Sequence, residues 1–139
     1  MFGIFYSNNL VSNIKCSKTP TQPAGPFFKQ KNLSDLNDLT NNGKAAGKII
    51  KIEGKILDKN CSPYPNCLID IWQANTYGKY NHKNDYSDNQ IDKNFNGYKK
   101  IITNSEGFYS FTTILPGSYK ISNSILRPPH IHLLIKTKT

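Results

Sequence analysis

The sequence predicts an all-β fold, either a β-sandwich with long loops or a partial barrel. Short runs with period-two hydrophobicity recur between residues 47 and 135, and proline, glycine and asparagine separate them. Almost no stretch keeps the spacing of an amphipathic helix. A chain of 139 residues is long enough for one domain with its own core. Several short strands at this spacing are typical of a sandwich.

The chain divides into an N-terminal extension, residues 1–18, and one domain over residues 19–139. The extension has no clear periodicity, and residues 19–26 contain too much proline and glycine for a helix or a central strand. Leucines at 33, 36 and 39 have helical spacing. Because Asn41, Asn42 and Gly43 follow at once, we expect a loop or a single turn there.

The first strand is predicted near residues 47–56, where Ile50, Ile52 and Ile56 alternate with charged residues that face water. After a turn at 58–65, residues 67–72 are interpreted as the returning strand. The polar stretch 78–97 is too long for a tight turn and is a candidate functional loop. The remaining expected elements are a hairpin of 100–103 and 108–114 around the turn 104–107, a short strand at 119–121 and a last strand at 130–135.

Charge and hydropathy exclude several classes of protein. The net charge is +9, but it comes from 17 scattered lysines and a single arginine, Arg127, whereas nucleic-acid readers favour arginine. We therefore expect no specific nucleic-acid partner. No run approaches the roughly 18 apolar residues of a membrane span. The expected protein is soluble, with the cytoplasm favoured over the periplasm or secretion.

Three cysteines occur, Cys16, Cys61 and Cys67, in no metal-binding spacing. Cys61 and Cys67 bracket a turn and could pair in an oxidising compartment. The interpretation we favour is that both are unpaired, half-buried thiols.

A candidate metal site lies near the end of the chain. His130 and His132 are two residues apart on the last predicted strand, so both rings are expected on one face, with Leu134. Such a pair can offer two imidazole nitrogens to one metal, and the alternative is a solvated or hydrogen-bonded pair. No cysteine or carboxylate neighbours would complete a zinc site or a 2-His-1-carboxylate iron site.

Six motifs, in order, resemble the intradiol ring-cleavage dioxygenases, and the third is closest to their protocatechuate 3,4-dioxygenase branch. Five of them are Thr-Pro-Thr-Gln-Pro-Ala-Gly-Pro-Phe at 19–27, Trp-Gln-Ala-Asn at 72–75, Gly-Lys-Tyr-Asn-His-Lys-Asn-Asp at 78–85, Pro-Gly-Ser-Tyr at 116–119 and Arg-Pro-Pro-His-Ile-His at 127–132. The other is the hairpin sequence at 103–113, which lies among them. The resemblance covers about residues 19–135.

The resemblance implies one mononuclear non-haem Fe(III), held by Tyr80, Tyr119, His130 and His132. Tyr119 and His130 would be the axial pair, and Tyr119 would leave the iron as a proton acceptor when substrate binds. Arg127 would stabilise negative charge that develops on the substrate. A bound cation lowers the pKa of a phenol, so two tyrosinates can balance the charge of Fe(III) at neutral pH.

The implied substrate is a catechol-type ring, cleaved by O2 between its two hydroxyl-bearing carbons to a muconate-type diacid. Gly25, Pro26 and Phe27 resemble the segment that lines the family's substrate mouth. Ile121 stands where the protocatechuate branch has a tryptophan, which leaves the particular catechol undetermined.

Two alternatives remain at the level of sequence. Prealbumin-like or carboxypeptidase-regulatory-like β-sandwich modules share the patterns at 47–72 and 100–119, and only Tyr80 and the Arg-Pro-Pro-His-Ile-His run argue against such a non-catalytic module. An inactive family member is not separable by sequence. The family continues beyond the His-x-His strand, whereas this sequence stops at Thr139. We expect a truncated reading frame or a pocket completed in a homo-oligomer or by a partner subunit.

Overall fold

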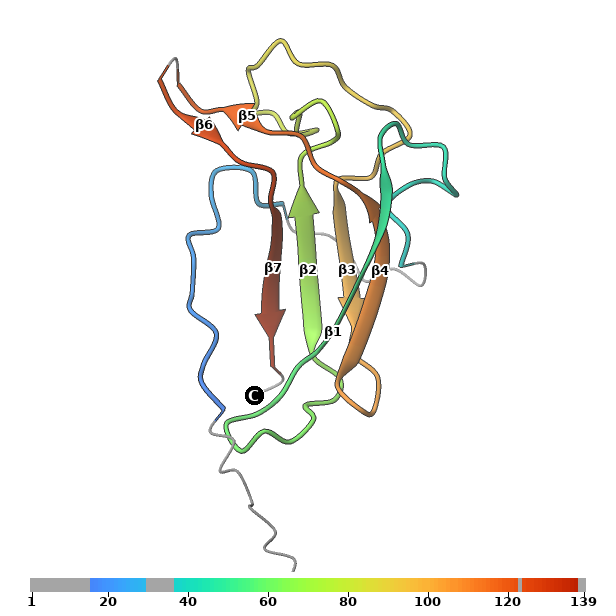
Figure 1. The fold of residues 1–139 in the computed structure, drawn as a ribbon, viewed down its shortest axis with the longest axis vertical. Coiled ribbons are helices and arrows are strands. Elements are labelled where there is room, and N and C mark those ends of the chain that lie inside the picture. Colours follow the sequence, from blue (N-terminus) through green and yellow to red (C-terminus); the bar gives the residue numbers. More distant parts are fainter. Residues whose placement is uncertain (1–15, 30–36, 123, 138–139) are drawn as a thin grey trace, which may run out of the picture.

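The computed structural model describes residues 16–29, 37–122 and 124–137, and all regular elements in these ranges are strands (Figure 1). No membrane-spanning helix is found in them. The strands are β1 (Ile49–Lys55), β2 (Leu68–Gln73), β3 (Tyr98–Ile102), β4 (Phe108–Ile114), β5 (Tyr119–Lys120), β6 (Leu126–Arg127) and β7 (Ile131–Lys136). The all-β prediction is confirmed.

The described strands form three antiparallel groups. The largest is the sheet β3-β2-β7, β1 pairs with β4, and the short β5 pairs with β6. Gln73, at the end of β2, ties the first two sheets together, because its amide donates to the Ile114 carbonyl (3.0 Å) and accepts from the Thr113 hydroxyl (2.7 Å).

The main core lies between β1-β4 and β3-β2-β7. Alternate residues of β2, Ile69 and Ile71, point into it, as the period of two requires. From the other sheet come Phe111 and Ile114, with Ile52 of β1 packed against them. Two apolar sheet faces pressed together make a β-sandwich, which agrees with the predicted fold class.

Two predicted strand pairings are wrong. The turn at 104–107 forms, with the Gly107 amide donating to the Asn104 carbonyl, but β3 pairs with β2 and β4 pairs with β1. Residues 68–73 likewise do not return beside β1. The connections from β1 to β2 and from β3 to β4 both cross from one sheet to the other. The two strands that each of these connections joins therefore lie in opposite sheets of the sandwich instead of pairing edge to edge. The pair β5-β6 was not predicted beyond the short strand at 119–121.

Of the three leucines with helical spacing, only Leu39 is among the described residues, and it does not lie in a helix. Leu39 is buried in the main core, and a turn follows at 41–44, as expected. Leu33 and Leu36 lie outside the described residues.

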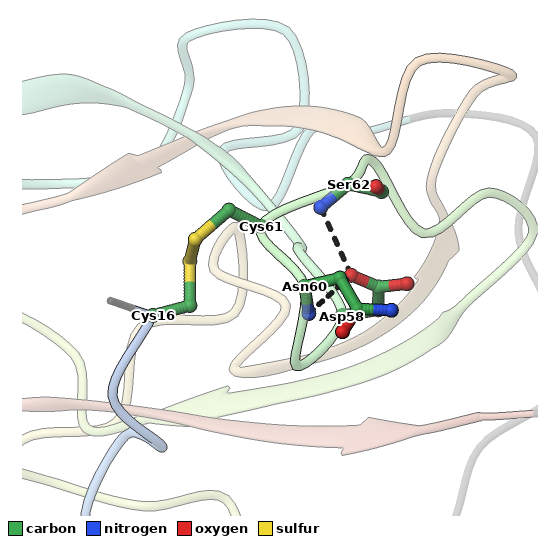
Figure 2. Close-up of a disulfide and its surroundings, with 5 residues drawn as sticks. All are labelled: Cys16, Asp58, Asn60, Cys61 and Ser62. Carbon is green, nitrogen blue, oxygen red and sulfur yellow. Dashed lines mark hydrogen bonds between the residues drawn. A yellow bond between two sulfur atoms is a disulfide. The ribbon is translucent and has the colours of Figure 1, made fainter. Parts of the chain in front are cut away.

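The cysteine prediction needs correction. Cys16 and Cys61 form a disulfide across a sequence separation of 45 (Figure 2). Cys67 is a free, buried thiol. The expectation of an unpaired Cys61 is wrong, and so is the possible Cys61–Cys67 pairing. Cys67 immediately precedes β2 and its side chain is fully buried, whereas Cys61 lies in a tight turn. Asp58 fixes that turn by accepting the amides of Asn60 and Ser62.

The disulfide anchors one end of an extended segment, residues 16–29, which we call the strap. Cys16 lies near the C-terminal end of β7, where Ser17–Thr19 share a cavity with Ile135 and Thr137. The strap then runs beside β7 (Figure 1) and ends with Phe27 and Phe28 packed on the outer face of β3-β2-β7. Proline and glycine keep it extended, so it covers the sheet without adding a strand.

Candidate metal and substrate site

A second cluster of side chains lies on the face of β3-β2-β7 that is turned away from the main core. In register across the three strands stand Tyr98, Trp72 and His132. The His132 ring stacks on Trp72 with centroids 4.5 Å apart and an interplanar angle of 1°. Tyr80 and Tyr119 complete the buried part of this cluster, which we call the aromatic cluster.

Tyr80 is the most deeply buried phenol of the aromatic cluster, with 1% of its surface exposed. It belongs to the long loop after β2 and not to a strand. Its ring stacks on Phe27 of the strap at 4.5 Å and meets Tyr119 edge-on at 5.3 Å. Its hydroxyl is buried and has no hydrogen-bond partner among the residues that the structure describes. Burial, then the neighbouring Tyr119, raises the pKa of Tyr80 above its ordinary value of 10.

Glycine allows the Tyr80 loop to approach β5. Gly78 has a positive φ of 76°, and a Cβ there would lie 2.1 Å from the Ser118 carbonyl oxygen, which is backbone and cannot swing away. Only glycine combines this conformation with this contact. The close approach brings Tyr80 beside Tyr119.

His130 lies beside Tyr119, with ring centroids 5.5 Å apart, and His132 lies beside His130. His130 immediately precedes β7 and His132 is its second residue, and their ring centroids are 4.8 Å apart. The Tyr119 oxygen is 3.4 Å from His130 Nε2, while His130 Nδ1 is 2.6 Å from the Pro128 carbonyl. A carbonyl only accepts, so Nδ1 carries the proton and Nε2 presents its lone pair toward Tyr119. Ile131, between the two histidines, points to the opposite face of β7 and packs on the main core.

Burial also keeps His132 neutral. Burial first, and then the charges of His130 and Arg127, lowers the pKa of His132 from 6.5 to about 4. A neutral imidazole is the form that binds metal ions.

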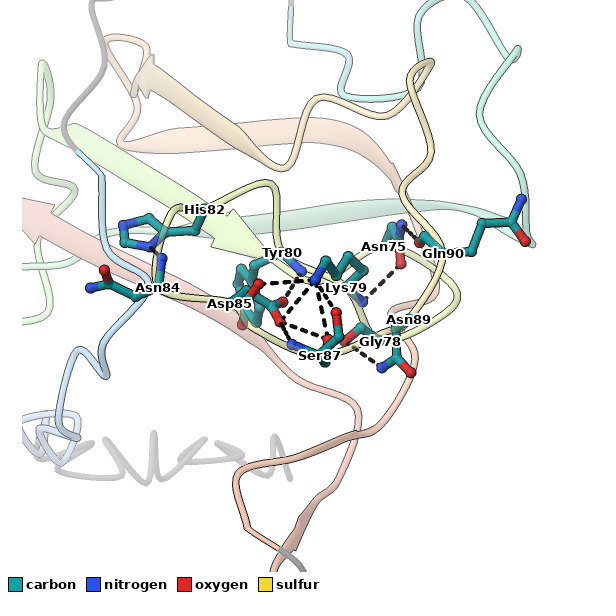
Figure 3. Close-up of polar contacts among 10 residues, drawn as sticks. All are labelled: Asn75, Gly78, Lys79, Tyr80, His82, Asn84, Asp85, Ser87, Asn89 and Gln90. Atoms are coloured by element: carbon teal, nitrogen blue, oxygen red, sulfur yellow. Dashed lines mark hydrogen bonds and ion pairs between the residues drawn. The ribbon is translucent and has the colours of Figure 1, made fainter.

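The loop that carries Tyr80 is held by two polar side chains, one on each side of the tyrosine (Figure 3). Before it, the Asn75 side-chain oxygen accepts the amides of Tyr77 and Lys79, both at 2.9 Å. After it, Asp85 Oδ2 accepts the Tyr80 amide at 2.7 Å, and Oδ1 pairs with Lys79 at 3.3 Å. Neither Asn75, Lys79 nor Asp85 was singled out from sequence. The available signal was a lysine and an aspartate flanking the tyrosine in the motif at 78–85.

Most of the predicted substrate residues share one cavity of about 790 Å³. Pro26, Phe27, Tyr119 and Ile121 line it, and Ile121 is half exposed. Gly25 is not among its lining residues and is exposed, in a turn with a φ of 72°. The structure therefore does not bring Gly25 to the cavity wall with its two neighbours.

Arg127 is exposed on β6, directly opposite Tyr119 in the β5-β6 register, and it does not line the cavity either. Its positive charge lowers the pKa of both Tyr80 and His132. At Tyr80 this opposes the larger effect of burial, and at His132 it adds to that effect.

The other aromatic residues behave as expected: Trp72, Tyr98 and Tyr109 pack, while Tyr77 and Tyr86 are exposed at the cavity rim. His82 meets Phe27 edge-on and accepts the Asn84 amide.

The donor atoms of Tyr80, Tyr119, His130 and His132 suit a hard metal ion such as Fe(III). Two phenols can become anionic oxygen ligands, two imidazoles supply nitrogen, and the buried Tyr80 hydroxyl lacks any other partner. Among the described residues, no group of three or more His, Cys, Asp or Glu could hold a metal.

Comparison with known proteins identifies the family of this chain. A protein family described as "Dioxygenase" matches residues 24–139. The protocatechuate 3,4-dioxygenase beta chain of Burkholderia cepacia is 40% identical over 114 residues, which are 77% of this chain and 48% of that protein. The chain belongs to the intradiol ring-cleavage dioxygenase family.

Solved structures show the same fold. The dioxygenase domain of a dioxygenase–carbohydrate-binding protein fusion from Streptomyces sp. SirexAA-E superposes with a TM-score of 0.70 at 26% identity, covering 87% of this chain and 68% of that chain. Catechol 1,2-dioxygenase from Acinetobacter sp. ADP1 gives 0.70 at 28% identity, covering 86% and 42%. The chain thus spans about half the length of the curated relative it matches.

Proposed function

We propose that this chain is a non-haem Fe(III) dioxygenase domain that cleaves a catechol-type ring between its hydroxyl-bearing carbons, using O2 and giving a muconate-type diacid. The observation that carries the proposal is the buried Tyr80 hydroxyl, which has no hydrogen-bond partner in the described part of the chain, in a cluster where the Tyr119 oxygen lies near His130 Nε2. A buried polar atom left unpaired is costly unless the working protein supplies a partner.

Tyr80, Tyr119, His130 and His132 are the residues we propose to hold the metal. When bound, Fe(III) would activate a chelated catecholate toward direct attack by O2. The Pro128 carbonyl orients His130 by accepting the hydrogen bond from Nδ1. The lone pair of Nε2 is therefore the one that would bind the metal. Stacking on Trp72 fixes the plane of His132, and burial keeps that ring unprotonated.

Tyr119 is the residue we propose to accept a substrate proton. It is the only one of the four ligands that lines the cavity, so its oxygen is the one that a catechol could meet on entry. Phe27 and Pro26 would contact the ring from the strap, and Ile121 would lie across the opening. The guanidinium of Arg127, opposite Tyr119, would stabilise negative charge on the deprotonated substrate.

The test is the visible absorption spectrum of protein loaded with Fe(III), before and after addition of a catechol. We expect a broad tyrosinate-to-iron band that shifts to the red with catechol and is lost in Tyr80→Phe. Tyr98→Phe is the matched control, because Tyr98 is a buried phenol of the same cluster whose hydroxyl donates to the Phe27 carbonyl at 2.8 Å. Oxygen uptake then measures turnover. A protein that stays colourless with ferric ion contradicts the proposal.

Partners and compartment are also proposals. The Burkholderia relative is named as a beta chain, and we propose that a second chain or a second copy completes the working assembly here. The cytoplasmic expectation stays a prediction, and the Cys16–Cys61 disulfide weighs against it because such bonds persist in oxidising compartments. Counting alkylated thiols in protein isolated under acid quench shows whether Cys16 and Cys61 are paired in the cell, as an oxidising compartment predicts, or reduced, as the cytoplasm predicts.

A further inference from the structure

We infer that Lys79 and Asp85 form a buried ion pair that acts as a positioning unit for Tyr80, setting the place of this ligand rather than only stabilising its loop. The inference rests on the proposed function, since it concerns Tyr80 as a ligand. It is carried by contacts within residues 78–87, which are drawn in Figure 3.

The pair is buried, although it lies in a polar surface loop. The side chains of Lys79 and Asp85 are 9% and 6% exposed. Lysine and aspartate are almost never buried unless they are paired. A buried ion pair adds little net stability compared with apolar residues of the same volume, so stability alone does not account for this one. What it does supply is a set of directional contacts.

These contacts fix both oxygens of Asp85. Oδ1 accepts the Ser87 amide at 3.0 Å and the Ser87 hydroxyl at 2.6 Å, and it pairs with Lys79 Nζ. Oδ2 accepts the Tyr80 amide at 2.7 Å. Lys79 Nζ also donates to the main-chain carbonyls of Asp85 and Ser87. A carboxylate whose two oxygens are both engaged cannot rotate, so the Tyr80 backbone is tied to a rigid acceptor.

Tyr80 needs such an anchor because no strand holds it. His132 is fixed by the ladder between β2 and β7, and Tyr119 by its pairing with β6. Tyr80 reaches the cluster from a loop, with Asn75 on one side and Asp85 on the other. Metal ligands tolerate displacements of only about 0.2 Å, so a loosened anchor should weaken metal binding before it unfolds the domain.

Asp38 provides a matched control for Asp85. Its carboxylate also fixes a loop, accepting the amide and hydroxyl of Thr40 and the amide of Asn42, but it touches no residue of the aromatic cluster. Asp38→Asn therefore removes a comparable loop anchor without affecting Tyr80. Lys79→Arg keeps the cation, and the double variant Lys79→Met/Asp85→Asn removes both charges, so that no lone charge stays buried if a single variant fails to fold.

The experiment has two readouts, ferric affinity and the ring NMR signals of 13C-labelled tyrosine in the metal-free protein, with Tyr80 assigned from Tyr80→Phe. We expect Asp85→Asn and the double variant to lower ferric affinity at least tenfold and to shift or broaden the Tyr80 signals. Lys79→Arg and Asp38→Asn should stay within about twofold of the parent and leave those signals in place.

Equal behaviour of Asp85→Asn and Asp38→Asn in both readouts would overturn the inference. If the parent protein binds no ferric ion, the proposed function fails. The tyrosine signals of the metal-free protein then still decide whether the pair positions Tyr80.

Discussion

The two faces of β2 carry two different interiors. One face contributes Ile69 and Ile71 to the main core, whose fully buried members are aliphatic side chains and phenylalanines, with the partly buried Tyr109 packed against them. The other face contributes Trp72 to the aromatic cluster, which holds three phenols and the imidazole stacked on the indole, and the hydroxyl of one phenol, Tyr80, has no partner among the described residues. The main core is built for stability, because it is almost entirely apolar. The aromatic cluster is suited to chemistry, because it retains buried polar atoms that folding alone does not satisfy.

The strongest test of this comparison is a cavity in the main core. Ile71→Ala should lower the free energy of unfolding by about 2–5 kcal/mol, because Ile71 is 1% exposed and its neighbours cannot fill the space. Urea unfolding measures the loss. The folded fraction should still bind one ferric ion per chain, and a loss of stoichiometry at temperatures where the variant is folded would show that the two interiors are not separable.

The strap tests the comparison from the other side, since its Phe27 and Phe28 pack on the aromatic cluster. Cys16→Ser should lower the free energy of unfolding by about 2–4 kcal/mol, because the disulfide closes a loop across a sequence separation of 45. Fluorescence of Trp72, the single tryptophan, should also change as Phe28 loosens from its ring. Cys67→Ser is the control for losing a thiol. An unchanged unfolding curve in Cys16→Ser would contradict the anchoring role.

A pH titration of the metal-free protein between pH 7 and pH 5 should act on the aromatic cluster through His132. The pKa of His132 is lowered from 6.5 to about 4 on folding, so the unfolded chain binds more protons between these values. Stability should therefore fall as the pH is lowered from about 6.5 toward 4. Urea unfolding at pH 7 and pH 5 measures this, and His132→Gln should remove most of the difference. Equal pH dependence in both proteins would assign the effect elsewhere.

The smallest expected effect distinguishes two buried phenols. Tyr80→Phe should leave the stability of the metal-free protein unchanged or raise it by up to about 1 kcal/mol, because the lost hydroxyl has no partner. Tyr98→Phe should cost about 1 kcal/mol, since it removes the hydrogen bond to the Phe27 carbonyl. Thermal melts of the two variants make the comparison. A larger loss for Tyr80→Phe would mean that its hydroxyl is satisfied without a metal.

Local patterns predicted the strands well because each depends on neighbours in sequence. The alternation around Ile50 and Ile52, the turn at 104–107 and the shared face of His130 and His132 all follow from a period of two and from turn chemistry. Strand partners did not follow, since a sandwich decides them by which apolar faces meet. The Cys16–Cys61 bond was missed for the same reason: nothing local brings those two residues together.

The sequence by itself determined the fold class and the family motifs, because residue type and short spacing encode them, and the resemblance carried by those motifs implied the four candidate ligands. Only the tertiary structure decided that Tyr80 is buried beside Tyr119, that Trp72 stacks on His132, and that Gly25 stays outside the cavity. It also decided that Lys79 and Asp85 meet inside a loop that reads as solvated and polar. Burial and long-range contact are properties of the packed chain, and no short window of sequence contains them.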